Sequence, residues 1–213
     1  VDTYQTSKDS AKEALNQIMS STLMSYKDAI NDHLTSFGAS FSIAELDANF
    51  TGGGGQATSR FVIDLRGSAI GLSTTGSHSF KTALSEADKR TLAFAFFIAY
   101  AEKLQDLNTK IIVIDDPMTS FDLNRRQQTR TVLKELQGSC EQLILIAHDA
   151  HFLREFRNDL MKTPNFNSND VHCIQLKSVR NGYSNLSKID LDQKCESGYF
   201  QSHRILNDYL DGE

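Results

Sequence analysis

Two uninterrupted runs of apolar residues constrain the fold of this chain more than any other feature. They are Ile111–Ile114 and Leu143–Ile146, and a polar segment with helical spacing lies between them. Neither run alternates between apolar and polar residues, which is typical of strands that are covered on both faces of a parallel sheet. Together with helices expected at 123–137 and 150–160, these strands predict an α/β fold with a mainly parallel sheet.

A long helix is expected before these strands. Residues 6–36 are polar, with apolar side chains three and four positions apart, and Gly38 is expected to end the helix. The segment is either the returning arm of a coiled coil or a single surface helix, because its heptads are not sustained as a coiled-coil seam requires. Since the chain begins with Val1 inside this helical pattern, we expect it to be a fragment of a longer protein.

A second helix is predicted over 84–107. Ser85 is a favourable N-cap residue, and Asp88 follows three positions later in the manner of a capping box. The stretch from Leu92 to Ala101 is apolar on nearly all sides, which predicts burial all round. Three strands and a last helix complete the organisation, at 61–65, 171–177, 183–189 and 198–210.

The glycines at 52–55 raise the question of a phosphate-binding loop. No Lys-Ser or Lys-Thr pair follows the last of them, so we interpret the segment as a flexible hairpin turn. A Lys-Thr pair does occur at Lys81 and Thr82, but Phe80 stands where a phosphate loop needs glycine. The motif G-x-x-x-x-G-K-[ST] occurs nowhere in the sequence.

Composition and charge exclude several classes of protein. The net charge of −5 means that any contact with DNA or RNA would be local rather than general. The three cysteines lie far apart and form neither a disulfide framework nor a zinc pattern, which favours a reducing cytoplasm. No apolar run approaches the roughly 20 residues of a membrane span, and we recognise no secretion signal.

Two carboxylates follow the first buried strand, and a histidine follows the second. Asp115 and Asp116 come directly after Ile114, and His148 follows the strand that ends at Ile146. Ligands of open α/β sheets bind at the carboxyl edge of the strands, so these side chains are expected to face one ligand. The first carboxylate suits Mg²⁺, the second can orient or deprotonate a water, and the histidine can donate to a phosphate oxygen. The alternative is a solvated turn beside a structural histidine.

Two further features allow a structural and a functional interpretation. The N-terminus of the helix that Ser85 opens favours an anion, although a simple helix cap would have the same sequence. The basic residues of the 123–137 helix could contact DNA or RNA, but we expect a solvated charged face. These residues are Arg125, Arg126, Arg130 and Lys134.

Taken together and in this order, the motifs resemble the C-terminal lobe of an ABC-type ATPase head of the SMC/RecF kind. The matching stretches are Leu84–Lys89 for the signature, Ile111–Pro117 for the Walker B strand and Thr119–Asp122 for the D-loop, with His148 as the switch histidine. The RloC/PrrC-like coiled-coil ATPases tend to have a signature that reads LSEGEK, a Walker B strand that ends in DDP and a D-loop that reads SSFD. The stretches of this chain resemble these motifs. The resemblance implies the C-terminal half of a P-loop NTPase.

The resemblance also implies a role for each matching residue, with ATP and Mg²⁺ as the cofactors. Asp115 would help to coordinate Mg²⁺, and Asp116 stands where most members have the catalytic glutamate. His148 would contact the γ-phosphate of ATP. Ser85 would touch the γ-phosphate of ATP held by an opposing head, with Ala87 beside it in the signature, and Asp122 would belong to the D-loop that couples the two sites.

Two departures from the family pattern are present. Ala87 replaces the signature glycine, and its methyl group crowds the approach of the backbone to a phosphate. The Walker A motif is absent, and the family carries it in an N-terminal lobe that precedes the coiled coil. We therefore expect residues 1–37 to be the end of the returning coiled-coil helix and 38–213 to be the C-terminal lobe. The chain alone should not bind ATP tightly, whereas the full-length protein should hydrolyse it.

The resemblance leaves three hypotheses about function open. The first is an ATPase head whose hydrolysis drives dimerisation of two heads in a DNA-associated or phage-defence system. The second is an ATP-gated nuclease that acts on RNA or DNA, similar to anticodon nucleases. The third is a degenerate scaffold that does not hydrolyse ATP. The expected partners are the N-terminal lobe of the same protein, a second head, and DNA or RNA, without a membrane.

Overall fold

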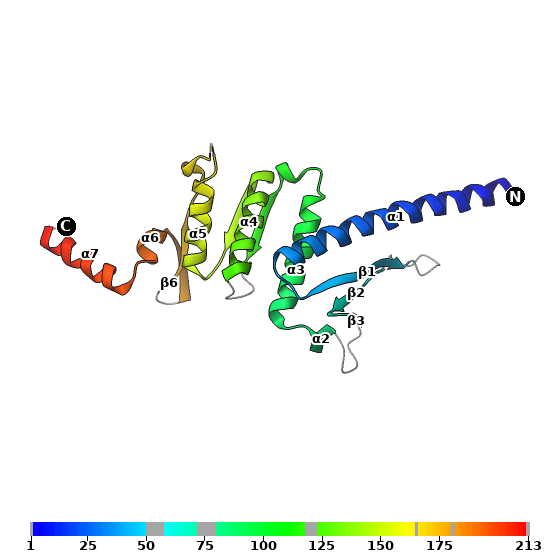
Figure 1. The fold of residues 1–213 in the computed structure, drawn as a ribbon. Helices are drawn as coiled ribbons and strands as arrows, with labels where there is room; N and C mark the ends of the chain where they lie inside the picture. The colour runs from blue at the N-terminus through cyan, green and yellow to red at the C-terminus, as the bar shows by residue number, and fades with distance from the viewer. Residues whose placement is uncertain are drawn as a thin grey trace.

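The computed structural model of the chain describes residues 2–49, 58–71, 80–117, 123–164, 166–179 and 182–211. Figure 1 shows an elongated molecule whose first and last helices lie at opposite ends. The elements in chain order are α1 (Asp2–Ser36), β1 (Phe41–Asn49), β2 (Thr58–Leu65), β3 (Ser68–Gly71), α2 (Phe80–Ala83), α3 (Glu86–Glu102), η1 (Leu107–Thr109), β4 (Ile111–Asp115), α4 (Leu123–Ser139), β5 (Gln142–Ile146), α5 (Ala150–Met161), η2 (Ser168–Asp170), β6 (Ile174–Val179), β7 (Tyr183–Lys188), α6 (Leu191–Lys194) and α7 (Gly198–Asp211). Within these described ranges no helix is long and apolar enough to cross a membrane.

The predicted first helix is confirmed as α1, which ends at Ser36, two residues before the expected stop at Gly38. Gly38 has a φ of +66°, a left-handed conformation that glycine adopts without strain. The Ala39 amide donates to the Leu34 carbonyl across this turn. Only the last third of α1 enters the core, where Ile30 and Leu34 are buried, whereas Leu15 and Ile18 are exposed. Most of α1 therefore projects from the molecule, as Figure 1 shows.

The strands β1, β2 and β3 form an antiparallel sheet below α1 (Figure 1). Phe41 pairs with Leu65, and β2 turns into β3 through Arg66 and Gly67, which both have positive φ. Such a two-residue turn matches the twist of a hairpin. The glycines at 52–55 lie outside the described residues.

The helix α3 confirms the predicted cap at Ser85 but not burial on all sides. Leu92 and Ile98 are buried, while Phe97 and Tyr100 lie on an exposed face. The helix packs against α1, where the pair His33–Glu102, at 3.0 Å, joins the two helices, and its Phe96 ring contacts Phe61 of β2. A helix that is apolar on nearly all sides can thus have an exposed face, and its sequence alone does not show this.

The strands β4 and β5 pair in parallel, as predicted, with Asp115 opposite Ile146. The helix α4 forms the crossover between them, which a parallel pair requires. The wider expectation of a mainly parallel sheet holds for this pair only. The other strand pairs in the described ranges are antiparallel, and Arg66 and Gly67 form the short turn between β2 and β3.

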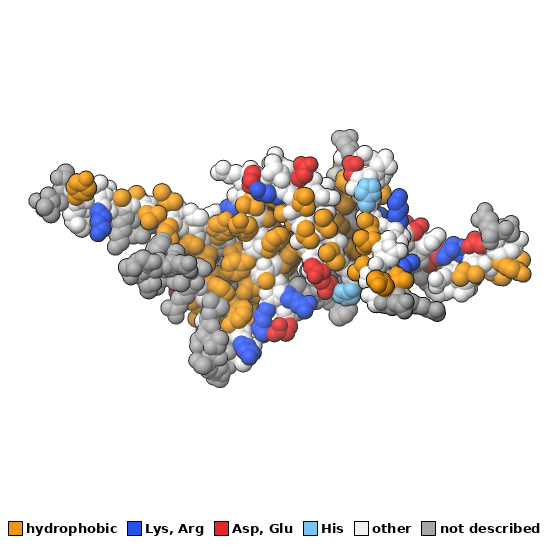
Figure 2. All heavy atoms as spheres, turned by 180° about the vertical axis from the view of Figure 1, so that it is seen from behind, with side chains coloured by type: hydrophobic (Ala, Val, Ile, Leu, Met, Phe, Trp, Pro, Cys, Tyr) orange, Lys and Arg blue, Asp and Glu red, His pale blue; other side chains and the backbone are white. Residues whose placement is uncertain are grey.

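The prediction that β4 and β5 are covered on both faces is wrong for this chain. Ile112 and Ile114 point into the core, but Ile111 is 58% exposed and Val113 is 56% exposed. On β5, Ile144 and Ile146 are exposed as well. Figure 2 shows hydrophobic side chains gathered over the middle of the molecule, seen from behind. We call the exposed side chains of Ile111, Val113, Ile144 and Ile146 the open face of the sheet.

The C-terminal strands and helix are confirmed as β6, β7 and α7. The short helix α6 was not predicted, although Asp190 caps it by accepting from the amides of Asp192 and Gln193. Leu191 and Cys195 are buried where α6 contacts α5. The last helix presents exposed apolar residues at its surface, which are Tyr199, Phe200, Ile205, Leu206, Tyr209 and Leu210.

Candidate functional site

The carboxyl edge of the β4–β5 sheet carries the two carboxylates that the sequence singled out. Asp115 is the last residue of β4, and its side chain lies exposed at the end of the strand. The Asp116 amide donates to the Ile146 carbonyl at 2.8 Å, so the ladder continues for one residue beyond β4. Asp116 then adopts a φ of +48°, which is rare for a residue other than glycine. This conformation turns the chain before the buried Pro117.

Asp116 and His148 lie in contact across the two strand ends. Nδ1 of His148 is 2.9 Å from Oδ1 of Asp116. The histidine side chain is 77% exposed and the aspartate side chain 36%, so the pair stands at the surface. The prediction that the two strands bring these side chains to one place is confirmed, whereas their chemical roles stay a prediction.

The contact also restricts what His148 can do. An ionised carboxylate only accepts hydrogen bonds, so the proton of the contact lies on Nδ1 of the ring. In the neutral ring Nε2 is then an acceptor. In the protonated ring both nitrogens donate, and Nε2 can reach an oxyanion while Nδ1 keeps Asp116 in place.

Ser85 uses its hydroxyl to begin α3. Its Oγ accepts from the Asp88 amide at 3.1 Å and donates to Oδ2 of Asp88 at 2.7 Å. The capping box is therefore incomplete, because the short Asp88 side chain bonds the hydroxyl rather than the Ser85 amide. Beside them, the Lys89 ammonium hydrogen-bonds Glu86 at 2.6 Å and holds the pKa of Glu86 below its usual value.

Arg125, in the first turn of α4, connects this helix start to two other elements. Its Nη1 lies 3.5 Å from Oδ1 of Asp88, and its Nη2 donates to the Gly38 carbonyl at 3.5 Å. The end of α1, the start of α3 and the start of α4 thus meet at one guanidinium. Ala87, in the first turn of α3, is half-buried.

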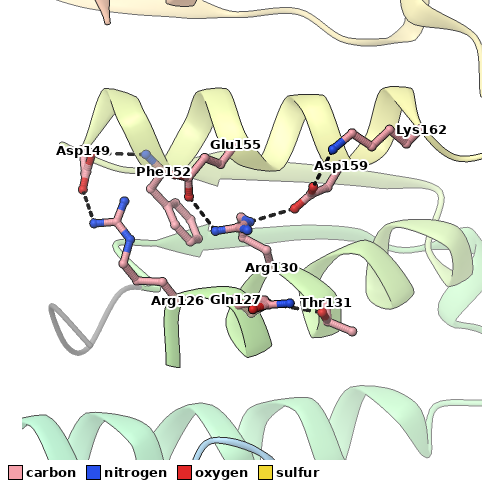
Figure 3. Close-up of polar contacts among 9 residues, drawn as sticks. All are labelled: Arg126, Gln127, Arg130, Thr131, Asp149, Phe152, Glu155, Asp159 and Lys162. Carbon is pink, nitrogen blue, oxygen red and sulfur yellow. Dashed lines mark hydrogen bonds and ion pairs between the residues drawn. The ribbon is translucent and has the colours of Figure 1, made fainter. Parts of the chain in front are cut away.

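The basic face of α4 is not solvated, contrary to our expectation. Arg126 contacts Asp149 at 3.0 Å, and Arg130 contacts Glu155 at 2.6 Å and Asp159 at 2.7 Å. Figure 3 shows both guanidinium groups between α4 and α5. Their side chains are only 13% and 16% exposed, because the acidic face of α5 covers them. These two arginines are therefore poor candidates for contact with DNA or RNA.

Asp149 completes the start of α5. Its Oδ1 accepts from the Phe152 amide at 3.1 Å, as an N-cap residue does. Burial alone would raise the pKa of Asp149, but the Phe152 amide and the charge of Arg126 outweigh burial and lower it. Sequence reasoning missed this contact. The i,i+4 spacing of Glu155 and Asp159 on α5 was a signal for the two contacts of Arg130, whereas Asp149, the partner of Arg126, lies outside that pattern.

The structure does not bring every predicted site residue together. No contact among the described residues joins Ser85 to Asp116 or His148, and Asp122 lies outside them. The same part of the chain holds no cluster of three or more His, Cys, Asp or Glu side chains that could bind a metal. Asp115 would thus offer Mg²⁺ one carboxylate, which fits an ion that completes its shell with water and phosphate oxygens.

Comparisons with known proteins concern the family and the fold of the chain. The family model AAA_13, described as AAA domain, matches residues 4–206. A comparison with curated proteins found no match.

Among solved structures, the fold is similar to a Smc head domain with a coiled coil and joint from Pyrococcus yayanosii, with a TM-score of 0.54 at 15% identity over 90% of this chain. A Smc head domain with an extended coiled coil from Pyrococcus furiosus, bound to the C-terminal domain of ScpA, gives 0.51 at 14% over 98%. A structure from work on ATP-driven dimerization and DNA-stimulated activation of SMC ATPases gives 0.53 at 14%, covering 92% of this chain and 97% of that one. This chain spans 33% and 45% of the two Pyrococcus chains.

Proposed function

Because this chain belongs to the AAA domain family, whose model covers residues 4–206, we propose that it is the C-terminal half of an ATPase head of the SMC type. The observation that carries the proposal is the contact between Asp116 and His148 at the carboxyl edge of a parallel strand pair. A carboxylate and an imidazole at that edge are suited to a water and a phosphate oxygen, respectively. The α/β fold that resembles SMC heads supports the same conclusion.

The residues of this chain would divide the work of hydrolysis as follows. Bound Mg²⁺–ATP supplies the phosphoanhydride and the neutralising charge, and Asp115 would hold the metal. Asp116 would orient a water through Oδ2 and accept its proton, since Oδ1 is engaged by His148. His148, when protonated, would donate from Nε2 to a phosphate oxygen. The side chain of Asp116 is one methylene shorter than the glutamate that most ABC ATPases carry. The position of its carboxylate relative to the water is therefore more critical for hydrolysis.

A phosphate cradle would come from elsewhere in the parent protein. The sequence lacks a Walker A motif, and we propose that an N-terminal lobe of the same protein provides it. The open face of the β4–β5 sheet supports this step, because four apolar side chains lie together without cover in this chain. An apolar sheet face of this kind is buried in parallel α/β sheets, and an N-terminal lobe that packs against this face would bury it.

Docking of two heads is the next part of the proposal. Ser85 has no contact with Asp116 or His148 among the described residues, which agrees with a role toward ATP on an opposing head. Ala87 beside Ser85, and Asp122 in the D-loop, would lie at the same junction. By the resemblance to SMC/RecF heads and RloC/PrrC-like ATPases, we propose a head dimer that acts in a DNA-associated or phage-defence system.

Two observations favour a second candidate, a scaffold that binds ATP without turnover. The Ser85 hydroxyl is engaged by Asp88, and the methyl group of Ala87 stands where the family has glycine. Both features would weaken contact with a phosphate on the opposing head. In a scaffold, the heads would assemble but Asp116 would have no catalytic task.

Turnover of the full-length parent protein distinguishes the two candidates. Asp116→Asn removes the proton acceptor, and we expect ATP binding to persist while turnover falls about 10²- to 10⁴-fold. Asp106→Asn is the matched control, because Asp106 is an exposed carboxylate that precedes β4 and pairs with Lys110. No turnover in the parent would contradict the ATPase and favour the scaffold. Equal turnover in all three proteins would contradict the catalytic role of Asp116.

A further inference from the structure

Arg126 reaches the segment that carries His148 from a different helix. Its Nη1 contacts Oδ2 of Asp149 at 3.0 Å, with side-chain exposures of 13% and 22%. The guanidinium carbon lies 6.0 Å from the centre of the Phe152 ring, which is fully buried. Figure 3 shows Arg126 extending from α4 to the start of α5, where Asp149 stands. The contact is thus shielded and geometrically restricted, unlike a surface ion pair.

Asp149 uses its two oxygens for two different elements. Oδ1 caps α5 through the Phe152 amide, and Oδ2 holds Arg126 of α4. His148 is the residue directly before it. On the other side of His148, the Ile146 carbonyl accepts from the Asp116 amide. The backbone that carries the imidazole is therefore held at both ends, by the sheet and by the Arg126–Asp149 pair.

Arg130 offers a natural comparison one turn further along α4. It makes two contacts with α5, to Glu155 and Asp159, and its side chain is as buried as that of Arg126. Both partners lie more than one helical turn beyond His148. Arg130 thus joins the same two helices without touching the segment that leads to the imidazole.

We propose that Arg126 is a positioning residue for His148, acting through Asp149. It fixes the first turn of α5 against α4, and thereby sets the direction in which the imidazole leaves the backbone toward Asp116. The inference deepens the proposed function and rests on it for its catalytic meaning. The geometric claim, however, concerns only residues of this chain and requires no nucleotide.

The experiment reads the protonation pattern of the His148 ring by ¹⁵N NMR in this 213-residue chain at fixed neutral pH. The contact with Asp116 favours the proton on Nδ1, so Asp116→Ala, which removes the carboxylate, defines the spectrum of a released ring. We expect Arg126→Gln to change the ratio of the two ring tautomers by about twofold to tenfold, in the direction of the released ring. A change of this size corresponds to the free energy of one hydrogen bond. Arg130→Gln should leave the ratio unchanged, although it removes two ion pairs.

A second variant separates the ion pair from the helix cap. Asp149→Ser keeps an N-cap oxygen but loses the partner of Arg126. We expect it to shift the His148 ratio as Arg126→Gln does, and the double variant to shift it no further. Urea denaturation of each variant establishes that the compared samples are folded.

Two results would overturn the inference. One is an unchanged His148 ratio in Arg126→Gln, and the other is an equal shift in Arg130→Gln. Because the ring spectrum is recorded without ATP, failure here leaves the proposed ATPase intact. Conversely, a parent protein without turnover would leave the ring measurement valid.

Discussion

Asp116 and His148 are 32 residues apart in the chain, yet Oδ1 of the one lies 2.9 Å from Nδ1 of the other. The parallel pairing of β4 and β5 creates this proximity, because both strands end at the same edge. Oδ2 of Asp116 and Nε2 of His148 take no part in this contact. Such a site can bind a water through the carboxylate and an oxyanion through the imidazole at the same time. The proposed function depends on these two separate roles.

Substitutions of His148 in the parent protein would test the role of each ring nitrogen. Asparagine can place its amide near Nδ1 and keep the contact with Asp116, whereas glutamine reaches toward the position of Nε2. If Nε2 donates to a phosphate, His148→Gln should retain more turnover than His148→Asn, with both reduced about 10- to 1,000-fold as for one lost donor to a transition state. Steady-state ATPase rates provide the measurement. His148→Asn at the rate of the unaltered parent would refute a phosphate contact.

Phe152 is predicted to contribute strongly to the stability of the chain. Its side chain is fully buried beneath Arg126, and Phe152→Ala should lower the free energy of unfolding by about 3–5 kcal/mol. Met161, at the exposed end of the same helix, is the control, since Met161→Ala should change it by about 0.5 kcal/mol or less. Urea denaturation measures both. Equal losses would show that α5 is not anchored through Phe152.

The pH dependence of stability should contain a contribution from Asp149. Its pKa is lower in the folded chain than the usual 3.8, so the contribution is complete above pH 3.8 and is lost as the pH falls through the lower folded value. Denaturation at several pH values should show the unaltered chain losing more stability below pH 3.8 than Asp149→Ser. Parallel pH profiles would mean that Asp149 carries no stabilising charge.

The open face of the sheet should matter for assembly rather than for folding. Val113→Lys places a charge at a position that is exposed in this chain, so its thermal midpoint should change little. The same variant should weaken association with the N-terminal lobe, because the lobe would have to bury the charge. Tyr199→Lys, on the exposed surface of α7, is the control for a charge placed elsewhere. Binding by calorimetry that is equal for both variants would contradict cover of this face by the lobe.

The sequence was most informative where local chemistry decides the structure. The cap at Ser85, the end of α1 near Gly38 and the parallel strands β4 and β5 were predicted because turn residues and apolar runs act over a few positions. The strand ends then located Asp116 and His148 at one edge, since both strands run in the same direction.

What the sequence did not reveal depends on neighbours distant in the chain. An apolar run does not show whether both faces of its strand are covered. Val113 lies in such a run, yet its side chain is exposed in this chain. Likewise, the sequence of a basic helix does not show which acidic residues it contacts. Arg126 and Arg130 were expected to face solvent, but acidic residues of α5 and its N-cap neutralise them. Comparing the charge spacing of the two helices would have found the contacts of Arg130 with Glu155 and Asp159.

The most direct test of the account is Mg²⁺–ATP binding and hydrolysis by this chain, first alone and then mixed with the N-terminal lobe of its parent. Because the chain has no Walker A motif, we predict no tight binding by the chain alone and turnover that appears on mixing. Asp116→Asn in the mixture should bind ATP without turnover. Tight binding by the isolated chain, or a mixture without turnover, would contradict the conclusion that β4 and β5 carry half of an ATPase site.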